Sequence, residues 1–313
     1  MAPVTAPSAV PAATRPAPLA VPRWYSHRWN RASLYRLAAV IARALPRPVR
    51  LRAAAIVGTV AHARLAVERR VIDGNVARVV PAVSAAERAA LVREVFRHFA
   101  ICFADLVSTN RRPAPGRWLA EVHGAGGIDA ALAAGRGMIV VTAHLGNWEL
   151  GGRLLAARVP RPIHVVVAAE PDPEVARFLR SSDTGVRFVT RRRPTDVLDL
   201  VSALRRNEVV AAQGDRALGD ESDADVTFFD EAAPFPLGPF VLARATGAPV
   251  VPAFCVLRPD RRYAITLGEP IPVAAGCERQ ALARWVRVLE DAIRRRPEQW
   301  FNFFDVWGGI PAR

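Results

Sequence analysis

The order of apolar runs after residue 118 constrains the fold of this 313-residue chain more than any other feature. Short runs rich in β-branched residues alternate with stretches of helical periodicity. The expected strands are 138–142, 163–168, 186–189, 208–212, 249–257 and 262–268, and the expected helices are 147–157, 172–181, 194–206, 238–246 and 278–296. This alternation predicts an α/β fold with a mixed, mostly parallel central sheet flanked by helices. In such sheets, ligands bind at the carboxyl ends of the strands.

The region before this sheet has a different character. Between residues 31 and 45 the apolar residues recur at helical spacing, and three arginines share another face, which predicts an amphipathic helix with a basic flank (Arg36, Arg43 and Arg47). The uncharged run that follows, 53–63, is shorter than the roughly 20 residues that a membrane-spanning helix needs. We expect helices that lie on a membrane without spanning it, and packing of the same helices against the protein body is the alternative.

Positive charge is concentrated at the N-terminus. Residues 1–70 contain twelve arginines and one acidic residue, Glu68, and therefore hold most of the net charge of +14. This predicts an anionic partner, either an anionic membrane surface or a nucleic acid. The sequence contains no recognised nucleic-acid-binding motif, so the membrane is the expected partner and nucleic acid is not.

Composition divides the chain into three parts. Residues 1–22 are rich in Ala and Pro, lack the features of a secretory signal, and are expected to form a disordered tail. Residues 23–70 form the predicted basic, amphipathic membrane-association region, and residues 71–313 form the main domain. Hydrophobic residues make up 51% of the chain, which is enough for a substantial core.

A histidine and a glutamate follow the expected strand 138–142, in the stretch TAHLGNWELGG. Gly146 permits a tight turn, Asn147 is a good helix N-cap, and the carboxylate of Glu149 in the first helical turn can reach back toward His144. A carboxylate on one ring nitrogen makes the other nitrogen a better base. The alternative is a histidine that only stabilises the turn. The spacing does not match the His-Glu-x-x-His helix of zinc proteases, and no metal site is expected.

Two further segments contain candidate site residues. Asp215 and Arg216 follow the expected strand 208–212 and so reach the same sheet edge as His144. The arginine can hold an anionic group such as a phosphate and the aspartate can orient an acceptor, whereas a salt-bridged loop is the alternative. Phe228 and Phe229 lie in an expected loop, where they line an apolar groove, meet lipid or are buried beneath the loop.

Four blocks together resemble a known family: HLGNWE, GDR, PLGPFVLARATGAPVVP and RRPEQWFNFF. In order and spacing they are similar to the lauroyl/myristoyl acyltransferases of lipid A biosynthesis, within the lysophospholipid acyltransferase-like superfamily. The resemblance covers residues 30–305, and the superfamily also includes acyltransferases of phosphatidylinositol mannosides. Glycerolipid acyltransferases, with an Asn-His-x-x-x-x-Asp motif, are less similar, because Ala143 and Glu149 replace the asparagine and the aspartate.

The resemblance implies transfer of a fatty acyl group from an acyl-carrier-protein or acyl-CoA thioester to a lipid hydroxyl. It implies His144 as general base, Glu149 as the carboxylate that orients it, and Asp215 as a further catalytic residue. The expected substrate-binding residues are Asn147, Arg180, Arg216, Phe228 and Phe229, with Arg177 and Arg187 as alternatives to Arg180. The thioester is a co-substrate, and no cofactor is expected. Residues 71–313 would then be the acyltransferase domain.

Two departures from the family pattern bear on location and acceptor. The sequence has no clear N-terminal spanning helix, so peripheral attachment to the cytoplasmic face of the bacterial inner membrane is expected. The ending QWFNFFDVWGG is unusually aromatic, which leaves the acceptor open between a lipid A-type molecule and a related glycolipid or lipid. A different class of function is a non-catalytic basic protein on the same fold that binds a membrane or a nucleic acid.

Overall fold

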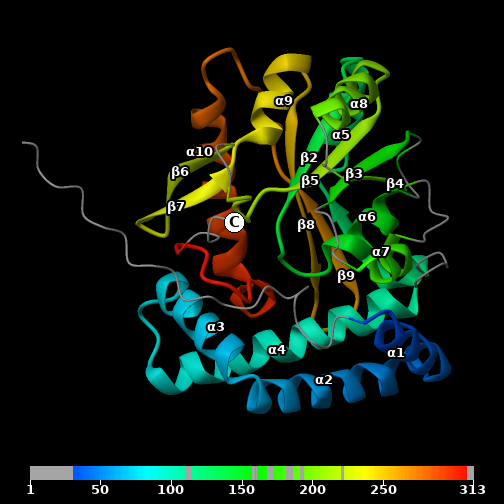
Figure 1. The fold of residues 1–313 in the computed structure, drawn as a ribbon, viewed down its shortest axis with the longest axis vertical. Helices are drawn as coiled ribbons and strands as arrows, with labels where there is room; N and C mark the ends of the chain where they lie inside the picture. The colour runs from blue at the N-terminus through cyan, green and yellow to red at the C-terminus, as the bar shows by residue number, and fades with distance from the viewer. Residues whose placement is uncertain are drawn as a thin grey trace, which may run out of the picture.

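A central sheet stands on a layer of N-terminal helices in the computed structural model (Figure 1). The structure describes residues 31–109, 115–156, 159, 161–167, 172–180, 186–190, 194–219 and 222–308. The helices are α1 (Ala32–Ala44), α2 (Arg47–Arg64), α3 (Ala66–Val79), α4 (Ala85–Ser108), α5 (Gly126–Ala133), α6 (Trp148–Ala156), α7 (Pro173–Arg180), α8 (Pro194–Arg205), α9 (Gly238–Thr246) and α10 (Glu278–Arg295), with the short 3-10 helices η2 (Gly116–Trp118) and η3 (Pro297–Gln299). The strands are β1 (Leu119–His123), β2 (Met138–Thr142), β3 (Ile163–Val167), β4 (Val186–Thr190), β5 (Val209–Gln213), β6 (Asp223–Phe228), β7 (Glu231–Pro236), β8 (Val250–Leu257) and β9 (Tyr263–Leu267).

The main sheet has the order β1-β9-β8-β2-β5-β3-β4. All neighbouring strands are parallel except β8 and β9, which form an antiparallel pair. The predicted mixed, mostly parallel α/β sheet is therefore confirmed. Strands β2 and β5 are in register from Met138 opposite Val209 to Thr142 opposite Gln213. The residues that follow these two strands consequently emerge side by side at one edge of the sheet.

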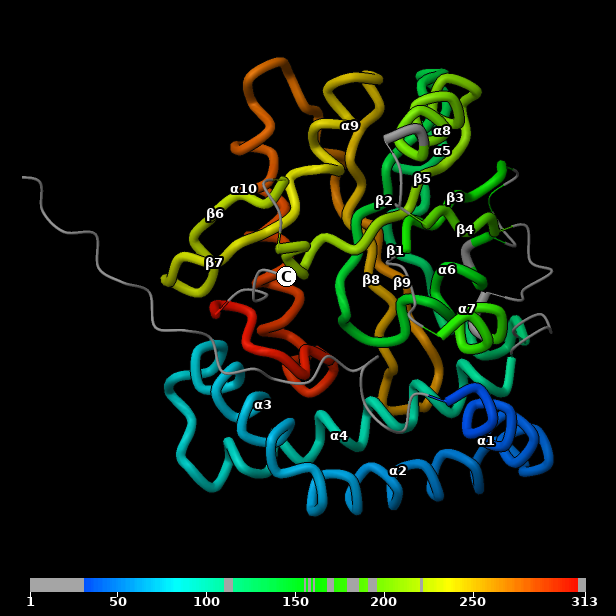
Figure 2. The backbone as a smooth tube through the Cα atoms, in the orientation of Figure 1, coloured from blue at the N-terminus to red at the C-terminus, as the bar shows by residue number. Residues whose placement is uncertain are grey.

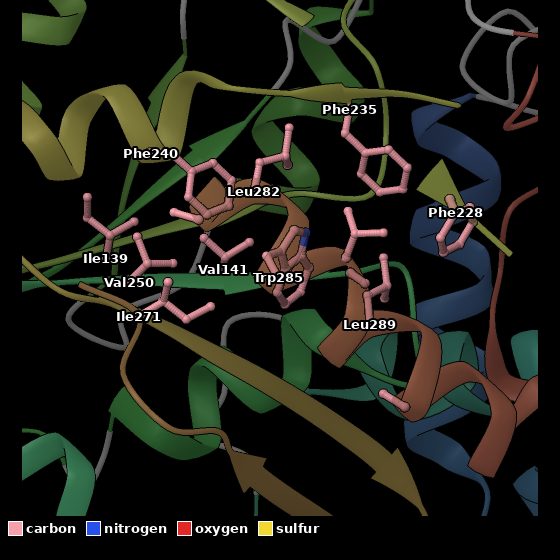
Figure 3. Close-up of a cluster of buried hydrophobic side chains, with 14 of the residues drawn as sticks. Ile139, Val141, Phe228, Phe235, Phe240, Val250, Ile271, Leu282, Trp285 and Leu289 are labelled. Carbon is pink, nitrogen blue, oxygen red and sulfur yellow. The ribbon is translucent and has the colours of Figure 1, made fainter. Parts of the chain in front are cut away.

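Helices cover both faces of the sheet because the strand residues alternate between two cores. Ile139 and Val141 point into one cluster, which includes side chains of α8, α9 and α10. Figure 3 shows this cluster around Trp285, whose side chain is fully buried. Met138 and Val140 point into the other cluster, which α4, α5 and α6 complete. The sheet edge that carries the site is thus held rigidly between two packed layers.

Residues 223–236, which the sequence led us to treat as a loop, form the antiparallel hairpin β6–β7. Phe229 and Asp230 make its turn with φ values of 48° and 65°. Positive φ at both central residues matches the two-residue turns that suit the twist of paired strands. The elements α3, α5 and β1 were also not anticipated.

The N-terminal helices form a layer beneath the sheet, with α2 lying along α4 (Figure 2). A β-carbon at Gly58 would lie 2.6 Å from the carbonyl oxygen of Phe96, so glycine allows this close approach of the two helices. Helix α4 begins with a capping box, in which Ser84 and Glu87 bond reciprocally. The predicted tail, 1–22, lies outside the described residues, and α3 runs through the expected boundary at residue 70.

Helix α2 has two apolar faces. One face packs against α4 through buried residues that include Leu51 and Ala54. On the other face, Ile56 and Val57 are 66% and 62% exposed. The sequence left two alternatives for these helices, lying on a membrane or packing against the protein body. In α2, one face packs against the protein and the opposite face points outward. Among the described helices, none has the length and hydrophobicity needed to cross a membrane.

Candidate active site

The carboxyl ends of β2 and β5 bring together a histidine and an aspartate that are 71 residues apart in the sequence. Nδ1 of His144 lies 2.8 Å from Oδ1 of Asp215. The backbone N–H of His144 also donates to Oδ2 of Asp215, at 2.9 Å. Both residues are buried, with exposed fractions of 5% and 1%. The sequence predicted both residues at this edge, and the structure shows that they form a hydrogen-bonded pair.

The hydrogen-bond partners of Asp215 define the tautomer of His144. Oδ2 of Asp215 accepts a second hydrogen bond from Nδ2 of Asn302, at 3.1 Å. Burial tends to raise the pKa of Asp215, but His144 and then Arg216 lower it to about 2. Because an ionised carboxylate only accepts hydrogen bonds, Nδ1 of His144 carries the proton and Nε2 retains its lone pair.

The surroundings of His144 favour the uncharged form of its imidazole. Burial, and to a smaller extent the positive charge of Arg216, lower the pKa of His144 to about 4 against the opposing effect of Asp215. The indole of Trp148 meets the ring edge-to-face, with centroids 4.6 Å apart. A neutral imidazole on a carboxylate has the properties of a general base that is ready at pH 7.

A tight turn carries the chain from His144 into α6. Gly146 has a φ of 67°, and a β-carbon there would lie 2.1 Å from the carbonyl oxygen of Cys255. The same carbonyl accepts a hydrogen bond from the backbone N–H of Asn147, at 2.7 Å. Glycine is therefore required at position 146 for both conformation and space.

The C-terminal segment after α10 braces this turn from the other side. The backbone N–H of Phe301 donates to the carbonyl oxygen of His144 at 2.7 Å, and that of Gly146 donates to the carbonyl oxygen of Gln299 at 2.8 Å. Gln299 and Asn302 are fully buried, and Asn302 also bonds to Asp215. The block RRPEQWFNFF contributes to the family resemblance, but its sequence predicted no site residue. The sequence signal for this bracing segment is that two amide residues, Gln299 and Asn302, lie within a run of aromatic residues.

Glu149 is not the hydrogen-bond partner that its spacing led us to expect for His144. It lies in the first turn of α6, half-buried, and its carboxylate forms no hydrogen bond with another described residue. Asp215 takes the position at Nδ1 because the neighbouring strand β5 delivers it directly opposite the ring. Burial raises the pKa of Glu149, and the positive charge of Arg153 opposes this shift.

Asn147 caps α6 as predicted, because its Oδ1 accepts a hydrogen bond from the backbone N–H of Leu150, at 3.4 Å. Its Nδ2 donates to the carbonyl oxygen of Cys102 at 2.9 Å and to Oη of Tyr263 at 3.1 Å. Both amide protons are thus used within the protein. Asn147 therefore stabilises the turn, and its expected role in binding substrate stays a prediction.

Arg216 contacts the C-terminal segment. Its Nε donates to Oδ1 of Asn302 at 2.8 Å and its Nη2 donates to the carbonyl oxygen of Phe301 at 3.0 Å. The guanidinium also lies over the ring of Phe304, 5.0 Å from the centroid. These contacts stabilise the segment that braces His144, and binding of an anion by Arg216 stays a prediction.

Phe228 and Phe229 belong to the core and do not line a groove. Their exposed fractions are 0% and 7%, and Phe228 stacks on Trp307 with centroids 5.2 Å apart. Phe228 also contacts Trp300, whereas Phe229 packs against Phe228 and lies beneath the guanidinium of Arg294. These contacts occupy the two rings that we expected to contact substrate. Arg180 is the last residue of α7, and its side chain lies outside the described residues, so its role stays a prediction.

Two cysteines near the site are poor nucleophiles. Cys102 and Cys255 are buried free thiols. Burial raises the pKa of both thiols, which keeps them protonated at neutral pH. By contrast, Nε2 of His144 has an available lone pair.

Comparison with known proteins identifies relatives of this chain. Residues 23–308 match the model of a family described as bacterial lipid A biosynthesis acyltransferase. The chain is 32% identical over 168 residues to a phosphatidylinositol mannoside acyltransferase of Mycobacterium tuberculosis. This alignment covers 52% of this chain and 50% of the relative. It is 31% identical over 136 residues to the protein of that name in Mycolicibacterium smegmatis, covering 42% and 44%.

A third relative is aligned over more of its length. The chain is 25% identical over 263 residues to a lipid A biosynthesis palmitoleoyltransferase of Escherichia coli, which covers 82% of this chain and 84% of the relative. By contrast, the chain spans about half the length of the mycobacterial relatives that it matches.

Proposed function

Because the chain belongs to the bacterial lipid A biosynthesis acyltransferase family, we propose that it is a membrane-associated O-acyltransferase that moves a fatty acyl group from a thioester to a lipid hydroxyl. One observation carries the proposal: His144 and Asp215 form a buried pair at the adjoining carboxyl ends of β2 and β5. This edge is where α/β proteins bind ligands. A neutral imidazole on a carboxylate is suited to activate a hydroxyl.

The proposed reaction is a direct transfer. Nε2 of His144 takes the proton of the acceptor hydroxyl while the oxygen attacks the thioester carbonyl. The C–O bond forms, the tetrahedral oxyanion collapses, and the C–S bond breaks. The imidazolium then gives its proton to the departing thiolate, so the histidine returns to its starting state. Asp215 stabilises the imidazolium and holds the ring through Nδ1.

Glu149 has an electrostatic role in this proposal. It lies in the first turn of α6, five residues after His144, and forms no hydrogen bond with another described residue that would commit its carboxylate elsewhere. In this proposal the carboxylate of Glu149, in the turn that follows His144, favours the positive charge that develops on His144 in the transition state. Glu149 would therefore act on turnover more than on binding of the acceptor.

The outward faces of α1 and α2 provide the proposed attachment to the membrane. Leu37 and Val40 of α1 are 55% and 62% exposed, and Ile56 and Val57 of α2 are exposed to a similar extent. Exposed arginines flank this apolar surface (Arg43, Arg52 and Arg64). Apolar side chains between arginines favour the interface of an anionic bilayer. We place the chain at the cytoplasmic face of the inner membrane, as a peripheral protein.

We propose the donor and the acceptor by their chemical class. The relatives are named a phosphatidylinositol mannoside acyltransferase and a lipid A biosynthesis palmitoleoyltransferase, and a glycolipid hydroxyl is the proposed acceptor here. The proposed donor is acyl-carrier protein or acyl-CoA, both of which are anionic. An anionic donor is attracted to a chain with a net charge of +14.

Lipid mass spectrometry tests the proposal. Lipids are compared between cells that lack the gene and the same cells complemented with wild type, His144→Ala or His123→Ala. His123 is exposed on β1, away from the pair with Asp215, and serves as the matched control. We expect wild type and His123→Ala, but not His144→Ala, to produce a lipid heavier by one acyl chain. An unchanged lipid profile with wild type would contradict the proposed function.

A further inference from the structure

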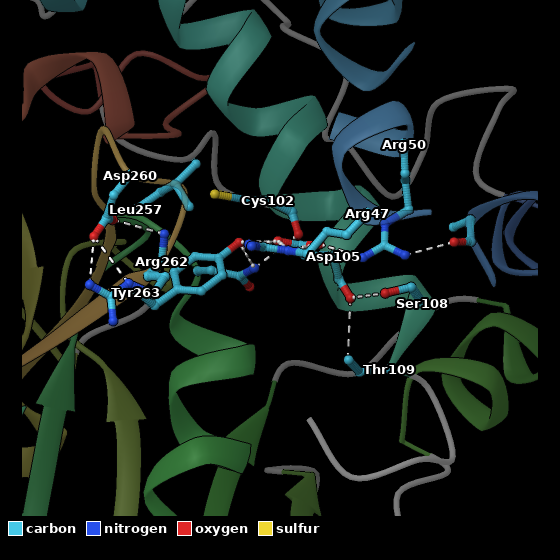
Figure 4. A network of polar contacts seen from close by, with 12 residues as sticks. Arg47, Arg50, Cys102, Asp105, Ser108, Thr109, Leu257, Asp260, Arg262 and Tyr263 are labelled. Carbon is cyan, nitrogen blue, oxygen red and sulfur yellow. Dashed lines mark hydrogen bonds and ion pairs between the residues drawn. The ribbon is translucent and has the colours of Figure 1, made fainter. Parts of the chain in front are cut away.

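A second buried polar network connects the helical layer to the active-site turn (Figure 4). Its centre is Asp105 of α4, which is fully buried. Asp105 accepts hydrogen bonds from Nη2 of Arg47 at 2.7 Å, from Nη2 of Arg50 at 2.8 Å and from Oη of Tyr263 at 3.0 Å. Both arginines belong to α2, and Tyr263 is the first residue of β9. A single carboxylate thus joins three elements.

The direction of each hydrogen bond in this network is fixed. Tyr263 has one hydroxyl proton, and it donates that proton to the carboxylate of Asp105. The same oxygen must therefore accept the hydrogen bond from Nδ2 of Asn147. Burial, followed by the nearby Cys102 and Asp105, raises the pKa of Tyr263 well above its usual value, so the hydroxyl stays protonated.

This direction determines how the amide of Asn147 is oriented. Nδ2 faces Tyr263 and the carbonyl oxygen of Cys102, and both of these groups are acceptors. Oδ1 consequently faces the first turn of α6, where it caps the backbone N–H of Leu150. An amide turned by 180° would place an acceptor against two acceptors and a donor against helix N–H groups. The network therefore permits one orientation of the cap.

Asn147 also closes the turn that begins at His144. The carbonyl oxygen of His144 is held by Phe301, and the backbone N–H of Asn147 is held by Cys255. The next residue, Trp148, contacts the imidazole edge-to-face, and Glu149 follows it. A displacement of Asn147 would thus move Trp148, which contacts the ring of His144.

We propose that Asp105 and Tyr263 are positioning residues for the reaction, which act through Asn147 to hold the active-site turn and the start of α6. The proposal rests on the proposed function, because acyl transfer is one of its readouts. A buried ion pair adds little net stability, since removing two guanidinium groups and a carboxylate from water is costly. Instead, the role of Arg47, Arg50 and Asp105 in this proposal is to hold the turn above them in one geometry.

Tyr263→Phe is the direct test, because it removes one oxygen atom and both of its hydrogen bonds. Ile265→Val is the matched control: Ile265 lies two residues along the same strand, is 2% exposed and makes only apolar contacts. We expect Tyr263→Phe to lower kcat by about 10- to 100-fold, as expected for a small misplacement of catalytic groups. We expect KM for donor and acceptor to stay within about threefold, and Ile265→Val to leave kcat within about threefold.

A second readout needs no acyl transfer. The ring nitrogens of His144 are observed by ¹⁵N NMR at pH 7.5, with the signals assigned by their loss in His144→Gln. We expect wild type and Ile265→Val to share one signal pair, with the proton on Nδ1, and Tyr263→Phe to shift or broaden that pair. If wild type transfers no acyl group to any acceptor but this shift is observed, the proposed function fails while the positioning role holds.

The outcomes that would overturn the proposal are specific. Unchanged His144 signals together with an unchanged kcat in Tyr263→Phe would show that the network is only structural. If Tyr263→Phe does not fold, Asn147→Ser replaces it, because serine retains the N-cap and loses the donor to Tyr263. Asn147→Ser should then reproduce the loss of kcat and the altered His144 signals, and wild-type values for both would refute the positioning role.

Discussion

Replacing Asp215 with asparagine should lower kcat about 10³- to 10⁴-fold, because it places the proton of His144 on the wrong nitrogen. Oδ2 of Asp215 accepts two hydrogen bonds, from the backbone N–H of His144 and from Nδ2 of Asn302, whereas Oδ1 accepts one, from Nδ1 of His144. Asparagine has a single oxygen. The orientation that keeps two of the three bonds places that oxygen toward the backbone N–H and Asn302.

The amide of the variant then points its NH₂ group at Nδ1 of His144. Nδ1 must become an acceptor, the proton moves to Nε2, and the nitrogen that faces the substrate can no longer take a proton. The opposite orientation would set the NH₂ group against two buried donors, at a cost of about 1–3 kcal/mol for each. A loss of 10³ to 10⁴ in kcat corresponds to about 4–5.5 kcal/mol in activation free energy.

Steady-state kinetics of the purified proteins measure this effect, with kcat and KM determined for wild type, Asp215→Asn and Asp291→Asn. Asp291 is exposed on α10 and provides the same chemical change outside the site. Circular dichroism establishes that each variant is folded. The reasoning about the tautomer is wrong if folded Asp215→Asn retains more than a tenth of the wild-type kcat.

Three further predictions concern acid stability, Glu149 and the membrane. Because the pKa of His144 falls from 6.5 to about 4 on folding, the unfolded chain takes up this proton first, and the histidine should reduce the unfolding free energy by about 3 kcal/mol as pH falls from 6.5 to 4. Urea unfolding of wild type and His144→Gln tests this, and equal pH slopes for the two would contradict it. Glu149→Gln should lower kcat about 10- to 100-fold with KM for the acceptor within about threefold, and a loss confined to KM would instead assign Glu149 to binding. Ile56→Asp should reduce co-sedimentation with vesicles of phosphatidylglycerol, while Leu198→Asp, which is 62% exposed on α8, should not; equal binding by both variants would exclude α2 as the attachment surface.

The sequence predicts most of the sheet because strand and helix periodicities are local properties. The strand expected at 138–142 matches β2, and the helix expected at 238–246 matches α9. It does not predict the hairpin β6–β7, whose strand β7 contains two prolines. The burial of Phe228 depends on Trp300 and Trp307, which lie more than 70 residues later in the sequence, and those contacts have no local signature.

The candidate site shows the same division. The position of His144 at a strand end follows from its own segment, as does the cap at Asn147. The partner of His144 cannot be predicted from that segment, because the spacing suggests Glu149, which is the nearest carboxylate in the sequence. Asp215 reaches the ring only because β5 lies beside β2 in the sheet, although β3 and β4 come between them in the chain. Strand order is a long-range property that one segment cannot reveal.

A single-turnover experiment with the purified chain tests direct transfer by His144 most directly. Radiolabelled palmitoyl-CoA is mixed with the chain and an acceptor glycolipid, the reaction is quenched at short times, and label is measured in the lipid and in the protein. We predict that label passes to the lipid with none bound covalently to the protein, and that His144→Gln transfers none. Covalent label on the protein, or wild-type transfer by His144→Gln, would contradict the account.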